Sequence, residues 1–317
     1  MNDLLMLKEA ARNAAASDMF RLMSSEDKGE KFVEELRRMP DEALNVMGRL
    51  NGVPEQQLHI HRAMIRNEDN EFTQGLCQVD GLLQPGDVIL MTSNQALANI
   101  QRALYKDAKS SHVALVHADF ICIDAIPKEG VSNRIISEVL ADAQSGWRVI
   151  RHKLVGKTNT DSIMRACTFY LAQPYLICPS TKSGKKFAYC SELARKVYRD
   201  VGVTSTGIPN KSIIAPAHFD RLADEHAEWM NVTDTVRPAI EFCQNYPELV
   251  RMSTKLFIKG LKLNRQRFKD RTKRLAEIQI LAKARKITKE QAKEATSQLR
   301  EIERNMNHTF WDVMTKA

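Results

Sequence analysis

The chain contains a cysteine, a histidine and an aspartate whose local contexts suit thiol catalysis. Cys190 follows a polar, glycine-containing loop and stands where a helical pattern begins. At the first turn of a helix, unpaired backbone N–H groups and the helix dipole stabilise a thiolate, and the same amides can bind an oxyanion. Cys190 is therefore the candidate nucleophile, and the alternative interpretation is a buried, inert cysteine.

A nucleophilic thiol needs an imidazole within reach and a third group that fixes the tautomer of the imidazole. Among the eight histidines, His112 has the best context, because a polar segment enters an apolar strand there. Asp124 lies inside the next apolar run, where an unpaired carboxylate is costly to bury. A hairpin around residues 118–119 would place Asp124 beside His112. His117 is the main competitor, and strand alternation directs it to the face opposite His112.

The elements expected around these residues indicate an α+β fold. Short apolar runs bounded by turn residues predict buried strands at residues 88–91, 112–117 and 120–126. Residues 139–140 and 147–151 suggest further strands, the latter because apolar and basic residues alternate there. Helical patterns cover residues 1–75, 95–108, 160–173 and the segment from Cys190 onward. We expect a small, mainly antiparallel sheet packed against the helix that begins at Cys190.

Composition narrows the class of protein. The chain has 317 residues, and 43% of them are hydrophobic, which is enough for a large core. No run of about 18 apolar residues predicts a membrane span, and charges interrupt the first 20 residues, so no signal-peptide core is expected. The six scattered cysteines form no paired motif, so we expect no disulfide framework, metal site or cofactor. This pattern favours a cytoplasmic protein, or an effector of a secretion system exported without a Sec signal.

Five segments, in chain order, resemble one family of enzymes. They are QPGDVIL (residues 84–90), SSHV (110–113), CIDA (122–125), AQPY (172–175) and YCSEL (189–193). They resemble the circularly permuted NlpC-type papain-like enzymes of the YaeF/YiiX group, in which the histidine strand precedes the cysteine helix. The resemblance covers about residues 82–220.

The resemblance implies roles for individual residues. Cys190 is similar to the family's nucleophile and His112 to its base, and Asp124 stands where that group commonly has a glutamate. Tyr189 and Ser191 flank the nucleophile as oxyanion or substrate contacts. The implied enzyme is a cysteine amidase, a peptidase-type hydrolase or an acyltransferase that acts on a peptide, a peptidoglycan fragment or a lipid. The sequence does not choose among these substrates.

Three regions are expected. They are an N-terminal helical region (1–78), a permuted papain-like catalytic domain (79–225) and a C-terminal basic helical region (226–317). Residues 251–317 carry 18 Lys or Arg residues against 7 Asp or Glu residues, so the basic charge of the chain belongs to its end. Apolar spacing there predicts two paired helices, and a capping box at Thr288 opens the second.

The basic helical pair supports a second hypothesis about function. Its residues 255–289 suit an anionic membrane surface or a protein partner, and a solvated basic face is the alternative interpretation. No nucleic-acid motif or interleaved aromatic pattern favours binding of DNA or RNA. The chain would then be a non-catalytic helical adaptor that binds through this hairpin.

Overall fold

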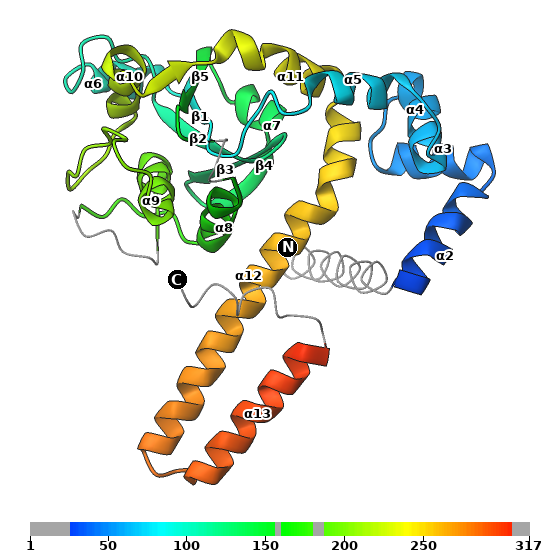
Figure 1. Cartoon of the computed structure of the whole chain (residues 1–317), viewed down its shortest axis with the longest axis vertical. Coiled ribbons are helices and arrows are strands. Elements are labelled where there is room, and N and C mark those ends of the chain that lie inside the picture. The colour runs from blue at the N-terminus through cyan, green and yellow to red at the C-terminus, as the bar shows by residue number, and fades with distance from the viewer. Residues whose placement is uncertain (1–25, 156–159, 180–186, 306–317) are drawn as a thin grey trace. The chain divides into compact units, whose positions relative to one another are not determined.

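The computed structural model describes residues 26–155, 160–179 and 187–305 (Figure 1). The chain divides into two compact units, Glu30–Ile258 and a second unit whose described residues are 26–29 and 259–305. The larger unit joins helices of the expected N-terminal region with the whole sheet. The boundaries expected at residues 78 and 225 stay a prediction.

A six-stranded antiparallel sheet is the centre of the larger unit, and its strand order is β4-β3-β2-β1-β5-β6. The strands are β1 (Val88–Thr92), β2 (His112–Ala118), β3 (Ile121–Ile126), β4 (Gly130–Ile135), β5 (Ser145–His152) and β6 (Trp229–Asn231). The expectation of an α+β fold with an antiparallel sheet is confirmed. A tight turn with Asp119 at φ +39° joins β2 to β3, so the expected hairpin forms.

The helices lie before, between and after the strands. They are α2 (Glu26–Arg37), α3 (Asp41–Leu50), the 3₁₀ turn η1 (Glu55–Gln57), α4 (Leu58–Arg66), α5 (Glu71–Val79), α6 (Gln95–Gln101), α7 (Ile136–Ala141), α8 (Thr160–Tyr170), α9 (Cys190–Val201), α10 (Pro216–Glu225), α11 (Thr233–Asn245), α12 (Pro247–Lys283) and α13 (Lys289–Asn305). No helix in the described part of the chain combines the length and the apolar character that crossing a membrane requires.

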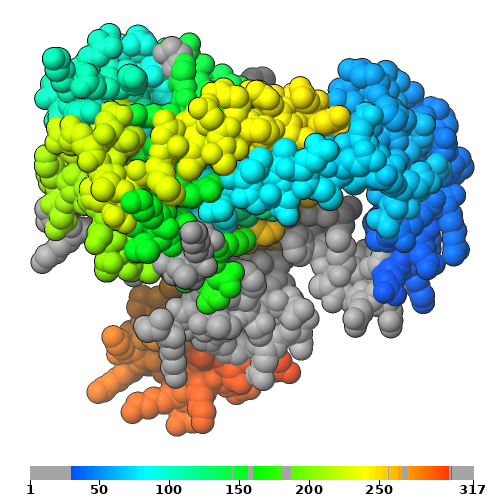
Figure 2. Space-filling model, turned by 45° about the horizontal axis from the view of Figure 1, so that its top comes forward, coloured from blue at the N-terminus to red at the C-terminus, as the bar shows by residue number. Residues whose placement is uncertain are grey.

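Helices cover both faces of the sheet. Strand residues such as Ile89 and Val116 pack into one core with Phe72 of α5 and Ile240 of α11. Helices α5 and α11 contact each other and lie side by side in the space-filling view (Figure 2). On the opposite face, His117 of β2 contacts α8, and α9 packs against α8, β2 and β3. This second layer brings the beginning of α9 to the strands that carry the candidate base.

Two expectations about secondary structure are wrong. Residues 139–140 were expected in a strand but lie in α7, which Glu138 caps by accepting a hydrogen bond from the Ile135 amide at 3.3 Å. The helix expected over residues 95–108 ends at Gln101. Strands β4 and β6 were not expected at all, because β4 carries a polar centre and β6 has only three residues.

In the second unit, a turn connects α12 to α13. The expected capping box at the beginning of α13 is confirmed. The Thr288 hydroxyl accepts a hydrogen bond from the Gln291 amide at 3.1 Å, and the Gln291 side chain accepts one from the Thr288 amide at 2.8 Å. These two bonds satisfy amides that the first turn of a helix otherwise leaves unpaired.

Candidate active site

Cys190 is the first residue of α9, and the structure holds it there from both sides. Leu193, Val197 and Tyr198 recur on one face of α9 and are buried in the core. On the other side, Ala188 forms a parallel bridge with Tyr175. The Ala188 amide donates a hydrogen bond of 3.1 Å to the Pro174 carbonyl, and the Ala188 carbonyl accepts one of 3.2 Å from the Leu176 amide. The thiol is therefore fixed at the helix N-terminus, where free amides favour negative charge, and it is half-buried.

A buried charged cluster on α9 fixes the segment that leads into Cys190. Glu192 forms ion pairs with Arg195 and, at 3.7 Å, with Lys196, and all three residues are buried. The Lys196 ammonium donates a hydrogen bond to the Phe187 carbonyl. Burial lowers the pKa of Lys196, although Glu192 opposes that change. Sequence reasoning assigned no role to Lys196, which ties the middle of α9 to the residues before the nucleophile.

His112 begins β2, and Asp124 lies on the neighbouring strand β3. The register places Leu115 opposite Ile123, so His112 and Asp124 are diagonal neighbours across the two strands. His112 Nε2 lies 3.1 Å from Asp124 Oδ2, and Asp124 is fully buried. Because Nε2 is engaged by the carboxylate, Nδ1 is the ring nitrogen left for Cys190. The structure thus brings together the three residues singled out in the sequence.

Asp124 has a second partner that the sequence did not reveal. Arg134 of β4 donates a hydrogen bond of 3.3 Å from Nη1 to the same Asp124 Oδ2 atom. Its Nη2 atom binds Asp142 Oδ2 at 2.7 Å and the Glu138 carbonyl at 2.9 Å, which anchors the guanidinium to α7. The polar centre of β4, which concealed this strand in the sequence, therefore contains a residue that positions the carboxylate.

The electrostatics of the site couple Cys190 to His112. Burial opposes the charged form of both groups. For His112, the hydrogen bond with Asp124, and after it the hydrogen bond and charge attraction with Cys190, outweigh burial and raise the pKa of His112 to about 10. The same pairing, together with the Ser191 hydroxyl and the Val113 backbone, lowers the pKa of Cys190. At neutral pH the arrangement therefore favours a thiolate beside an imidazolium.

The residues that flank Cys190 differ in what they contact. The Ser191 hydroxyl lies 3.7 Å from the Cys190 sulfur, and Ser191 is fully buried. The Tyr189 hydroxyl instead accepts a hydrogen bond of 2.9 Å from the Ile214 amide, so it contacts the segment that leads into α10. Tyr175, to which sequence analysis assigned no role, is half-buried. Its pKa is raised by burial and then by the negative charge of Cys190, so it lies within electrostatic reach of the sulfur.

The competing histidine contacts other residues. His117 lies 2.9 Å from Asn133 through Nδ1 and 3.1 Å from Thr168 through Nε2. Burial lowers its pKa, which is typical of a neutral histidine within a packed interior. Across residues 26–155, 160–179 and 187–305, no three His, Cys, Asp or Glu side chains converge as ligands of one metal ion.

Comparisons with known proteins add little to this geometry. No protein-family model matches the chain, and no curated protein matches it. Among solved structures, the chain is similar to the crystal structure of the metalloprotein YiiX from Escherichia coli O157:H7 (DUF1105). The two share 19% sequence identity over 49% of this chain and 92% of that chain, with a TM-score of 0.34. A likeness at this TM-score carries no argument about the site or its chemistry.

Proposed function

We propose that this chain is a thiol hydrolase or acyltransferase that forms an acyl-cysteine at Cys190. The observation that carries the proposal is the placement of Cys190 at the N-terminus of α9 beside His112, whose Nε2 atom lies 3.1 Å from Asp124 Oδ2. In this arrangement the pKa of Cys190 is lowered and the pKa of His112 is raised. Such a pair is what a cysteine nucleophile requires. Burial instead raises the pKa of Cys122, Cys167 and Cys243.

The residues fit the steps of acyl transfer. The Cys190 thiolate attacks the carbonyl carbon of an amide or ester, a C–S bond forms, and the carbonyl electron pair moves onto oxygen. Free amides at the beginning of α9 suit that oxyanion. Collapse of the intermediate breaks the bond to the leaving amine or alcohol, which takes its proton from the His112 imidazolium. Neutral His112 then takes a proton from water or an acceptor amine, which attacks the thioester and releases Cys190.

Asp124 acts through His112 in this scheme. Its contact with Nε2 keeps that nitrogen protonated, so Nδ1 faces the sulfur and exchanges the proton. The order His112, Asp124, Cys190 along the chain and the five resembling segments support a permuted papain-like core for this domain. The acyl donor is accordingly proposed to be an amide, a peptide or an acyl ester.

Alkylation with iodoacetamide near pH 6, with each labelled site identified by mass spectrometry, tests the proposal. At that pH an ordinary thiol with a pKa of about 8.5 is only about 0.3% ionised. Cys77 and Cys178 are exposed, so they serve as internal controls for accessibility. We expect half-buried Cys190 to react at least about tenfold faster than either control.

Variants distinguish activation from simple access to the reagent. The fast reaction should vanish in Cys190→Ala and should fall to the rate of Cys77 in His112→Ala. A rate at Cys190 that is no faster than at the exposed cysteines, or that is unchanged in His112→Ala, would overturn the enzyme proposal. That result would leave the non-catalytic adaptor, with its basic residues 255–289, as the better account.

A further inference from the structure

A pocket of about 380 Å³ lies beside the candidate site, and none of the three site residues lines it. Its walls come from β1, from both ends of α6, from β5 and from the segment that leads into β2. Three cationic side chains line it, those of Arg102, Lys109 and Arg148, and no acidic side chain does. The pocket is therefore a candidate for binding an anion.

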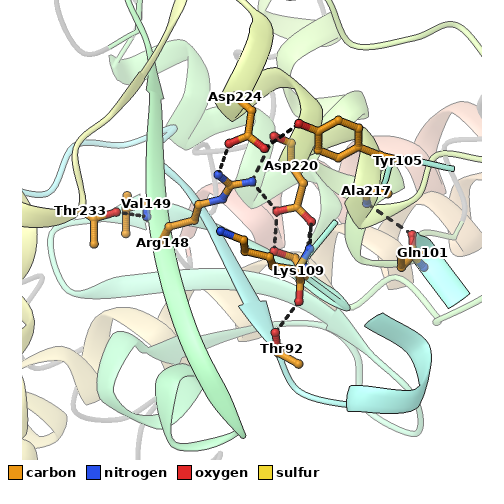
Figure 3. A network of polar contacts seen from close by, with 11 residues as sticks. Thr92, Gln101, Tyr105, Lys109, Arg148, Val149, Ala217, Asp220, Asp224 and Thr233 are labelled. Atoms are coloured by element: carbon orange, nitrogen blue, oxygen red, sulfur yellow. Dashed lines mark hydrogen bonds and ion pairs between the residues drawn. The ribbon is translucent and has the colours of Figure 1, made fainter. Parts of the chain in front are cut away.

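The charge of one of the three cations, Arg148, is neutralised by ion pairs that also hold its side chain in place. Arg148 binds Asp224 Oδ1 at 2.6 Å and Asp220 Oδ1 at 2.7 Å (Figure 3). Asp220 also accepts hydrogen bonds from the Lys109 and Ser110 amides at 3.0 and 2.8 Å. This network holds residues 109–110 against β5 and fixes the backbone from which the Lys109 side chain extends.

The other two cations are exposed. Among the described residues, neither Arg102 nor Lys109 has a carboxylate within ion-pair distance, although Lys109 contributes to the field that lowers the pKa of Asp224. The Lys109 side chain extends toward Arg148 in the close view (Figure 3). Of the three cations that line the pocket, only Arg148 is paired with carboxylates among the described residues, and no acidic side chain lines the pocket. Arginine and lysine in such a position bind carboxylate or phosphate oxygens.

The backbone places this pocket next to the base. Ser110, which lines the pocket, is two residues from His112, and two residues span at most about 7 Å. Leu90 also lines it and is the Cα partner of Val113, whose backbone contacts Cys190. A group bound here lies within reach of a substrate whose carbonyl is at Cys190.

We propose that this pocket binds an anionic oxygen group, a carboxylate or a phosphate, on the substrate that reacts at Cys190. The assignment to a substrate rests on the proposed function, whereas the binding of the anion does not. Arg102 and Lys109 supply positive charge that no carboxylate pairs with among the described residues, and the Arg148 network holds the backbone of Lys109 in place. The substrate class is then an acyl compound, or an acyl acceptor, that carries a negative charge near the reacting bond.

Isothermal titration calorimetry of full-length Cys190→Ala protein tests the pocket without any turnover. Inorganic phosphate and acetate are titrated separately, and the tighter of the two identifies the source of the anion. Arg102→Gln and Lys109→Gln, each added to Cys190→Ala, should weaken binding at least about tenfold, the loss of one charge-assisted contact. Lys106→Gln is the matched control, because Lys106 is an exposed cation near Lys109 that does not line the pocket. It should leave the Kd within about twofold.

The outcomes separate the two proposals. Absence of saturable binding of both anions, or equal affinities in all three variants, would overturn the anion pocket. Alkylation of Cys190 in the otherwise unaltered protein reports on the proposed function alone. Ordinary Cys190 reactivity with retained, Lys109-dependent binding would leave the pocket standing and remove the acyl-transfer role.

Discussion

Two buried carboxylates in this protein have similar surroundings and different capabilities. Asp124 and Asp220 are both fully buried, and each accepts a hydrogen bond from an arginine on a strand of the sheet. The other partners of Asp220 are two backbone amides and the Ser110 hydroxyl, none of which titrates near neutral pH. The second partner of Asp124 is His112, which is coupled to a thiol. Burial of a charge by itself therefore does not indicate a reactive site, whereas coupling to titratable groups is the feature that favours one.

The two carboxylates also differ in how completely they are satisfied. Both oxygens of Asp220 accept hydrogen bonds. Asp124 Oδ1 is buried and accepts none from the described residues, since His112 and Arg134 both use Oδ2. An unsatisfied buried carboxylate oxygen carries a free-energy penalty. The complete hydrogen bonding of Asp220 therefore favours a stabilising role. The unsatisfied oxygen of Asp124 destabilises the fold, and such destabilising features are typical of functional sites.

The largest expected effect follows from replacing the nucleophile itself. Cys190→Ser keeps the size of the side chain but replaces a thiolate with a hydroxyl that His112 must deprotonate. Hydrolysis of an activated phenyl ester should fall at least about 1,000-fold. The far-ultraviolet circular dichroism should stay unchanged. Ester turnover that survives in Cys190→Ser would show that the reaction occurs at another residue and that the Asp124 cluster is not reactive.

The next effect separates the two carboxylates that bind Arg134. Asp124→Asn removes the charge that supports the imidazolium, so the pKa of His112 should decrease and ester turnover should fall about 100-fold. Asp142→Asn is the matched control, because Asp142 binds Arg134 at 2.7 Å and has no hydrogen bond with His112. Its turnover should stay within about twofold. Equal losses in both variants would show that anchoring Arg134, and not the Asp124–His112 contact, matters.

The smallest effect on reactivity is expected at the other cluster. Asp220→Asn removes one of the two carboxylates that pair with Arg148. The free energy of unfolding should therefore decrease by about 3 kcal/mol. The rate of Cys190 alkylation near pH 6 should change less than about twofold, because the network contacts none of the three site residues. Urea denaturation and alkylation of the same sample measure both quantities. A large change in alkylation with unchanged stability would reverse the assignment of the two clusters.

Much of the site was predictable because its residues interrupt simple patterns. Cys190 stands where a loop becomes a helix, and Asp124 interrupts an apolar strand, so each signal lies within a few residues of sequence. The hairpin that joins His112 to Asp124 is also local, with a two-residue turn. Strands β1, β2 and β3 followed from apolar runs in the same way, and β5 followed from the alternation of apolar and basic residues.

The remainder depends on contacts that no local pattern records. Arg134 lies in a strand whose polar centre resembles a loop, and its polarity is explained only by Asp124 and Asp142 across the fold. The helix α7 was expected as a strand, because its short apolar run has no period long enough to distinguish the two. Arg148 and Asp220 are 72 positions apart, so their pairing and the pocket beside them were outside the reach of sequence reasoning.

The most direct test of the central claim is the ionisation of Cys190. The ultraviolet absorbance of the thiolate, measured from about pH 4 to about pH 9 as the difference between the unaltered protein and Cys190→Ala, reports this group alone. Because the folded protein depresses the pKa of Cys190, the thiolate should persist as the pH falls well below about 8.5, and His112→Ala should abolish that persistence. A titration near pH 8.5 that is unaffected by His112→Ala would contradict the account.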